Sequence, residues 1–168
     1  MRNIYGIGGL VISIGILLSF TVNAAAQSTA SSSSDRRAVE RLFAAWNSRD
    51  AAKVVASFAG DAVYEDVAAG KVNRGHDEIR RWVTDAFRDI ENFKLETVCS
   101  SFYKGGAVVE WVWSGRDKGL FKTGKNFSVR GVSVIDVRGG KISTYKEYYD
   151  FSTAMRQLGL LPEEKGAQ

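Results

Sequence analysis

The chain has 168 residues, 45% of them hydrophobic, which suits one compact domain and is too short for two ordinary ones. One histidine, His76, and one cysteine, Cys99, exclude multi-histidine and multi-cysteine metal sites and any intramolecular disulfide, and leave open only a metal site made of carboxylates. The formal net charge is +4, but no dense Lys/Arg run accompanies it, which argues against nucleic acid as a partner.

The N-terminus has the pattern of a secretory signal peptide. A positive start with Arg2 precedes residues 4–22, which carry no charge, and small residues follow around Ala24 and Ala26. This pattern predicts cleavage after Ala24 or Ala26, and therefore an exported protein, periplasmic or secreted, with no membrane contact after cleavage. An uncleaved anchor is the alternative, because residues 4–22 nearly reach the length of a membrane span. The four glycines in that run favour cleavage.

Composition divides the chain into four parts. We expect a signal peptide over residues 1–26, a Ser-rich flexible linker over 27–34, a folded domain over 35–162 and a short tail over 163–168. An exported chain with a single cysteine has no disulfide and must rely on its hydrophobic core. Cys99 itself is predicted to be a small buried side chain in a strand.

The first half of the domain shows helical spacing of apolar residues. The repeats fall in residues 39–46, 54–58 and 79–87, and they predict three helices. Asp50 can cap the second helix, which Gly60 ends, before a short strand over 62–66 and a loop over 67–75. Trp46 and Trp82 lie on the apolar faces of these helices and are expected to be core residues.

After Asn92 the apolar period changes to two. Residues 93–103, 107–114, 127–137 and 141–150 predict strands, with Gly-Gly hairpin signals at 105–106 and 139–140, and a short helix follows over 152–158. Helices grouped ahead of a meander of strands predict an α+β domain, with the helices packed on one face of a curved, mostly antiparallel sheet.

Short motifs then suggest a family. They are Phe58 to Asp66, Arg74-Gly75 followed by Ile79, Val109 to Gly115, Val129 to Val134, and Gly140 to Ile142 with Tyr148-Tyr149-Asp150. In order and spacing, over residues 36–161, they resemble the SnoaL-like branch of the nuclear transport factor 2-like superfamily, which includes ketosteroid isomerases, polyketide cyclases and limonene epoxide hydrolases. The resemblance implies a cone-shaped sheet with three N-terminal helices packed on it, a pocket for a small hydrophobic molecule, no cofactor, and in many members a homodimer.

Strand parity predicts which side chains face that pocket. If Trp111 points inward, then Trp113 does too, and the same alternation groups Tyr145 with Glu147 and Tyr149 on the last strand. Rings with a few hydroxyl groups suit a hydrophobic molecule that carries one or two polar groups. The expected substrate-binding residues are Tyr64, Trp111, Trp113, Ser133, Tyr145 and Tyr149.

Asp66 is the first candidate for chemistry. Its position matches that of the general base in the ketosteroid isomerases that the chain resembles. A carboxylate at an apolar pocket loses part of its hydration, so its pKa rises and it can accept and return protons. The alternative interpretation is structural, because aspartates at strand ends commonly bind the following loop.

Glu147 and Asp117 are the candidates for a second proton carrier. Glu147 resembles in position a catalytic aspartate of the limonene epoxide hydrolases, whose Tyr-x-Asn resembles Tyr64-x-Asp66 here. Asp117 stands where the polyketide cyclases have a pocket histidine. Two carboxyl groups in one pocket push one pKa upward. The alternative for Glu147 is a half-exposed strand residue paired with a lysine or arginine.

Departures from the family pattern leave two hypotheses. Leu42 replaces the oxyanion-binding tyrosine of the isomerases and Ser133 their protonated aspartate, so ketosteroid isomerisation itself is not expected. One hypothesis is a cofactor-independent isomerase, cyclase or hydratase with Asp66 as base and Glu147 or Asp117 as second carrier. The other is a non-catalytic ligand-binding or assembly module. Carboxyl groups of Asp66 and Glu147 that converge on one space would favour the enzyme.

Overall fold

The computed structural model describes residues 21–162, with side chains from Ser33 onward. Most of the predicted signal peptide and the predicted tail therefore lie outside the described residues. The elements in chain order are α1 (Thr21–Asn47), α2 (Ala51–Ala56), β1 (Phe58–Asp66), β2 (Lys71–Arg74), α3 (Gly75–Asp89), β3 (Ile90–Tyr103), β4 (Gly106–Asp117), β5 (Asn126–Arg138), β6 (Lys141–Tyr149) and α4 (Phe151–Gln157).

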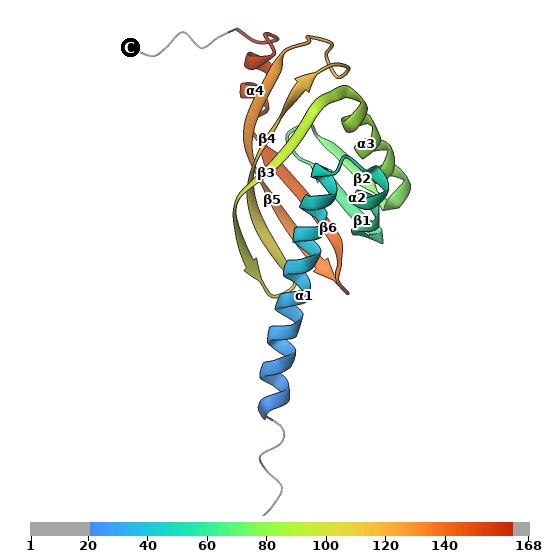
Figure 1. Ribbon diagram of the computed structural model, residues 1–168, viewed down its shortest axis with the longest axis vertical. Helices are drawn as coiled ribbons and strands as arrows, with labels where there is room; N and C mark the ends of the chain where they lie inside the picture. Colours follow the sequence, from blue (N-terminus) through green and yellow to red (C-terminus); the bar gives the residue numbers. More distant parts are fainter. Residues whose placement is uncertain (1–20, 163–168) are drawn as a thin grey trace, which may run out of the picture.

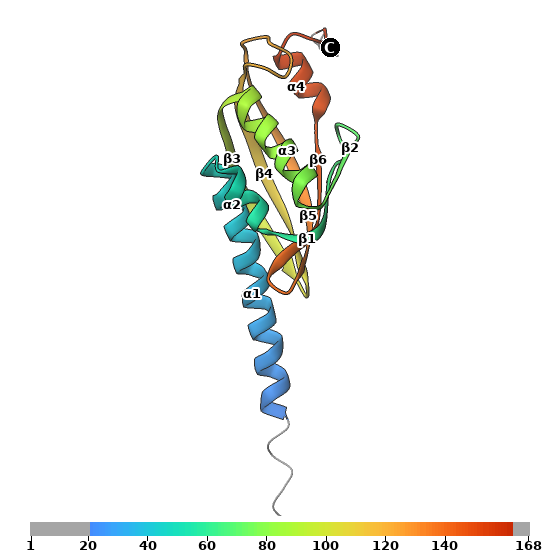
Figure 2. The same cartoon turned by 90° about the vertical axis from the view of Figure 1, so that its right-hand side faces the viewer.

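The strands form one curved sheet in the order β2-β1-β6-β5-β4-β3. The four strands β3 to β6 make the predicted antiparallel meander, and β1 joins it as a parallel neighbour of β6. Helices α1, α2 and α3 lie on the same side of the sheet, and α4 lies at one end of it (Figures 1 and 2). The predicted α+β architecture with helices on one face of a curved, unclosed sheet is confirmed.

Two local predictions about strands were wrong. Phe58 begins β1 rather than ending the second helix, because it pairs with Ile142 of β6. The predicted loop over 67–75 contains β2, which forms a short hairpin with the end of β1. Phe58 pairs with a residue that is distant in the sequence, and β2 is too short to show a pattern, so local periodicity predicts neither strand pairing.

Cys99 lies in a strand, as predicted, but the prediction that it is buried was wrong, because this residue is exposed. It follows a register shift in the pairing of β3 with β4, in the half of β3 where most side chains are exposed. Since β3 is the edge strand of the sheet, its outer half has a neighbour on one side only.

Helix α1 begins at Thr21 and so continues through residues 27–34, for which the sequence predicts a flexible linker. Its sequence contains neither glycine nor proline and includes several alanines, which have the highest helix propensity. The helix projects beyond the sheet at its N-terminal end (Figures 1 and 2). Over residues 21–162, no helix combines the length and the apolar character that a membrane crossing requires.

The hydrophobic core lies between the helices and the sheet. Leu42 of α1, Val83 of α3 and Ile135 of β5 are each fully buried. Trp46 stacks on Phe93 with ring centroids 5.4 Å apart, which packs α1 against β3. This aromatic packing closes one end of the space in which the candidate site lies.

Candidate functional site

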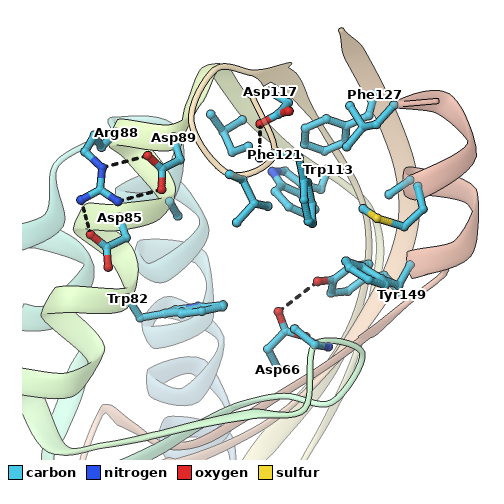
Figure 3. A pocket seen from close by; sticks show the side chains of 18 residues that line it. Asp66, Trp82, Asp85, Arg88, Asp89, Trp113, Asp117, Phe121, Phe127 and Tyr149 are labelled. Atoms are coloured by element: carbon cyan, nitrogen blue, oxygen red, sulfur yellow. Dashed lines mark hydrogen bonds and ion pairs between the residues drawn. The ribbon is translucent and has the colours of Figure 1, made fainter. Parts of the chain in front are cut away.

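A cavity of about 320 Å³, the outer cavity, opens between α3, α4 and the sheet. Its wall is mostly apolar and aromatic, and Figure 3 shows Trp82, Trp113 and Tyr149 placed around the space with Asp66 beside them. Such a cavity fits a small hydrophobic molecule that meets few polar groups. Further apolar side chains on its wall are Leu120, Phe121, Phe127, Phe151, Met155 and Leu158.

A second, smaller space of about 60 Å³, the inner cavity, lies next to the outer one. The two share the lining residues Asp66, Trp82, Ala86, Trp113 and Tyr149. The wall of the inner cavity is mostly aromatic and carries a few carboxyl and hydroxyl groups, and the space has enough room for a water molecule. The side chains that line only this inner space include Tyr64, Trp111, Tyr145 and Glu147.

Asp66 is the last residue of β1 and lies at the junction of the two cavities. One carboxyl oxygen accepts a hydrogen bond from the Ala69 amide at 2.8 Å, and the other accepts one from the Tyr149 hydroxyl at 3.0 Å. Burial raises the pKa of Asp66 above its ordinary value, although these hydrogen bonds oppose the rise. Asp66 therefore makes the loop contact that the structural interpretation predicts, and it also lines both cavities.

Glu147 is the register partner of Asp66 across the parallel pair of β1 and β6, so the two side chains lie on the same face of the sheet. Its Oε1 accepts a hydrogen bond of 2.6 Å from the Tyr64 hydroxyl. Burial and the negative charge of Asp66 raise the pKa of Glu147 to about 8, and hydrogen bonding by Tyr64 and Tyr145 offsets only part of the rise. Among the described residues, no lysine or arginine forms an ion pair with Glu147.

A hydrogen-bonded chain behind the inner cavity orients Tyr145. The Trp111 indole donates to Ser133 Oγ at 2.7 Å, and Ser133 donates to the Tyr145 hydroxyl at 2.7 Å. Because Ser133 donates to the Tyr145 oxygen, the Tyr145 proton stays available for Glu147. Gly131 makes room for the Trp111 ring, since a Cβ there would lie 2.2 Å from it. These hydrogen bonds hold the Tyr145 phenol beside the Glu147 carboxyl group, which the Tyr64 phenol also binds.

Two of the predicted site residues do not take the expected place. Ser133 is fully buried and lines neither cavity, because Trp111 and Tyr145 engage its hydroxyl. Asp117 lines the outer cavity, but its carboxyl oxygens accept bonds from the Phe121 amide and from the amide and hydroxyl of Thr123. Burial favours a higher pKa for Asp117, but these hydrogen bonds outweigh it and lower the pKa. Asp117 therefore organises its own loop.

Several lining residues were not expected from the sequence. Trp82 packs against the core, as predicted, but it also lines both cavities. Trp82 lies on the same helical face as the buried Ile79 and Val83, so periodicity alone could not distinguish a cavity-lining residue from a fully buried one. Phe121, on the loop after β4, and Phe151, on α4, also line the outer cavity. Neither lies on a predicted strand, so strand alternation gave no indication that they share this space.

On the α3 side of the cavity, the charged side chains are paired with one another. Arg88 binds Asp85 and Asp89 at 2.6 and 2.8 Å (Figure 3). In the part of the chain that the structure describes, no three His, Cys, Asp or Glu side chains are grouped as a metal ion would require. The cavity-lining groups whose pKa is raised are Asp66, Glu147, Tyr64, Tyr145 and Tyr149.

Comparisons with known proteins agree with this architecture. Residues 39–145 match the family model for the SnoaL-like domain. A hypothetical protein with a ketosteroid isomerase-like fold from Catenulispora acidiphila DSM 44928, solved in complex with trimethylamine, is 27% identical, with a TM-score of 0.68 over 74% of this chain and 93% of that chain. No curated protein matches this sequence.

Two further solved structures share the fold. An LEH-like epoxide hydrolase of M. tuberculosis is 19% identical, with a TM-score of 0.65 over 76% of this chain and 90% of that one. TerC, co-crystallised with polyporic acid, is 14% identical, with a TM-score of 0.65 over 75% of this chain and 98% of that one. Because the family model covers most of the folded domain, this protein belongs to the SnoaL-like domain family.

Proposed function

We propose that this protein is an exported, cofactor-independent enzyme that binds a small hydrophobic molecule and transfers protons on it, with Asp66 as base and Glu147 as acid. The observation that carries the proposal is the pairing of these two carboxyl groups across β1 and β6, at cavities that adjoin. Relatives that bind trimethylamine and polyporic acid support a small-molecule ligand, and a relative that is an epoxide hydrolase supports catalysis.

Asp66 acts on the part of the ligand that lies where the two cavities meet. The apolar body of the ligand packs against Trp82 and Trp113 in the outer cavity. A partly desolvated carboxylate next to it removes a proton from an activated C–H group or from a water molecule. Tyr149 holds the carboxyl group in position through its 3.0 Å hydrogen bond.

Glu147 completes the transfer from the inner cavity. With a pKa of about 8 it is mostly protonated at neutral pH, and it can give that proton to a developing oxyanion. One proton taken by Asp66 and one given by Glu147 leave the pair with its original proton count. Isomerisation, cyclisation and hydration all need this exchange and no further group from the chain.

The test uses the protein without its leader and a panel of hydrophobic ketones and epoxides. Mass spectrometry follows deuterium uptake from D₂O next to the carbonyl and ¹⁸O uptake from labelled water. We expect Asp66→Asn to lower the rate on any active compound by a factor of about 10² to 10⁴. Turnover that survives this substitution would remove Asp66 from the mechanism.

A matched control lies one residue away. Glu65 precedes Asp66 on β1, but it pairs with Lys146 at 3.7 Å, as a neighbouring residue on the opposite face. Glu65→Gln removes a carboxylate of similar position and should leave turnover unchanged. Ligands that raise the melting temperature, while none of the panel reacts, would instead favour the binding module, in which Ser133 and Trp111 serve only to shape the wall.

A further inference from the structure

Four large apolar side chains are exposed at one end of the molecule. Leu120 and Phe121 are 52% and 40% exposed on the rim of the outer cavity, and Leu160 and Leu161 are 45% and 43% exposed just beyond α4. The two segments meet, because a Cβ at Gly159 would lie 2.3 Å from the Lys125 amine. Figures 1 and 2 show both segments at the end of the molecule opposite the start of α1.

Positive charge surrounds this apolar group. Lys118, Lys122 and Lys125 are exposed on the same loop, and none forms an ion pair with a carboxylate among the described residues. The acidic residues nearby already have partners, as Arg88 binds Asp85 and Asp89, and Arg116 binds Glu91. We call the four apolar residues and the three lysines the mouth patch.

Hydrogen bonds to its backbone order the loop that carries Leu120 and Phe121. The Asp117 carboxyl group bonds the amides of Phe121 and Thr123 on either side of the tip, and the Asp117 carbonyl accepts a bond from the Gly124 amide. The amides of Lys118 and Gly119 donate to the Asp89 carbonyl at 2.8 and 3.0 Å, which ties the loop to α3. Exposure of Leu120 and Phe121 is therefore a feature of an ordered loop.

We propose that the mouth patch docks on an anionic lipid surface. Exposed leucine and phenylalanine with flanking lysines suit the boundary between headgroups and acyl chains, where the apolar groups insert and the lysines meet anionic headgroups. Charge complementarity selects an anionic bilayer over a neutral one. This revises the expectation of no membrane contact after cleavage, because the patch joins segments that are far apart in the sequence.

Docking at this place has a consequence for ligand entry. The outer cavity opens beside the inserted side chains, since Leu120 and Phe121 form part of its rim. A hydrophobic molecule dissolved in the bilayer then reaches the cavity without crossing water. This consequence rests on the proposed function, whereas the docking itself does not.

The test is co-sedimentation of the leaderless protein with vesicles, without any substrate. One set of vesicles is phosphatidylcholine alone, and the other is an equal mixture of phosphatidylcholine and phosphatidylglycerol. We expect binding to the mixed vesicles to be at least tenfold stronger and to weaken with added salt, because salt screens the lysines. The double variant Leu120→Ser, Phe121→Ser and the triple variant with Gln at the three lysines should each lose most of this binding.

A control variant removes exposed apolar surface elsewhere. Tyr148 and Val134 are exposed on the sheet, and Tyr148→Ser with Val134→Ser should bind mixed vesicles like the original chain. Urea denaturation confirms that each variant is folded. Absence of binding to mixed vesicles would overturn the proposal, and so would binding by the Leu120/Phe121 variant as strong as that of the original chain. A dimer of the original chain that becomes monomeric in this variant would also overturn it, because the patch would then be a subunit interface. Vesicle binding by a protein that turns over none of the panel would leave the docking proposal intact and count against the proposed function.

Discussion

Single residues determine what chemistry the site can do, and Glu147 shows why position matters more than residue type. Its neighbour Glu65 lies on the other face of the sheet, with Lys146 as its partner. Glu147 has the negative Asp66 beside it and two phenols around it, and no cation among the described residues. The same functional group therefore forms an ion pair on one face of the sheet, while on the other face burial and a neighbouring carboxylate raise its pKa to about 8.

This difference predicts a pH dependence of folding stability. In the unfolded chain Glu147 titrates near 4.5 and in the folded one near 8, so the folded state binds more protons between these values. The free energy of unfolding should therefore fall as pH rises from about 4.5 to 8, by at most about 1.4 kcal/mol per pH unit from this residue. Urea denaturation across this range measures the slope.

The variant Glu147→Gln should flatten that slope, because glutamine does not titrate. Some decline should remain, since the pKa of Asp66 is raised as well and acts in the same direction. The exposed aspartates with lowered pKa, such as Asp61 and Asp150, affect stability only at lower pH. Equal slopes for the variant and the original chain would contradict the raised pKa of Glu147.

Strands β5 and β6 show how far the sequence can predict which side chains line a cavity. Alternation along a strand places Tyr145, Glu147 and Tyr149 on the cavity side, and all three line a cavity. Alternation also places Ser133 on the inner face of β5, yet this residue lies behind Trp111 and Tyr145. Parity predicts the face on which a side chain lies, but the depth depends on the size and packing of neighbours on other strands.

At the scale of elements, the loop between β4 and β5 depends on one carboxyl group. The sequence resemblance predicts Asp117 as a proton carrier, because its position matches a pocket histidine in the polyketide cyclases. The structure shows instead that it closes the turn from Asp117 to Thr123. These contacts form only when residues four and six positions later fold back, which no repeat in the sequence indicates.

Replacement of Asp117 by alanine should therefore loosen this loop. The partly buried amides of Phe121 and Thr123 lose their acceptor, which costs about 1–3 kcal/mol for each group that water cannot reach and less where water replaces the carboxyl group. Hydrogen–deuterium exchange read by mass spectrometry should show faster exchange across the loop and little change in β6. Asp117→Asn keeps one oxygen acceptor and should give an intermediate effect. Unchanged exchange in the alanine variant would show that the loop is held by other contacts.

Elements with long-range partners were the hardest to predict. The start of β1 follows helical spacing, and only its pairing with β6 makes Phe58 part of a strand. Strand β2 has four residues and a single neighbour, so its pattern is too short to recognise. The long strands of the meander were predicted to within a few residues, because each has a sustained period of two and because short glycine turns make two of their three connections.

At the scale of the whole molecule, the fold class followed from the order of helices and strands, but the cavity did not. The outer cavity is built from α3, α4, the sheet and the loop after β4. Its size depends on how these elements are spaced in three dimensions. A pattern that repeats along one segment carries no information about that spacing.

The proposed export gives a prediction about the mature chain. Expressed in a bacterium with its own leader, the protein should be recovered outside the cytoplasm with an N-terminus at Ala25 or Gln27, as determined by intact-mass measurement. Substitution of Ala24 and Ala26 by leucine should block cleavage, because the cleavage site requires small residues. A full-length mass in the membrane fraction, with no shorter form, would indicate the uncleaved anchor.

The direction of α1 has a consequence for that leader. The helix has 27 residues, so it is about 40 Å long. It begins at the end of the molecule opposite α4 (Figure 1), and the outer cavity opens beside α4. A copy still tethered by its leader would hold the entrance of its cavity away from the bilayer that anchors it. Proteolytic release would then do more than free the protein, because only a detached molecule could turn over and present its other end to a lipid surface.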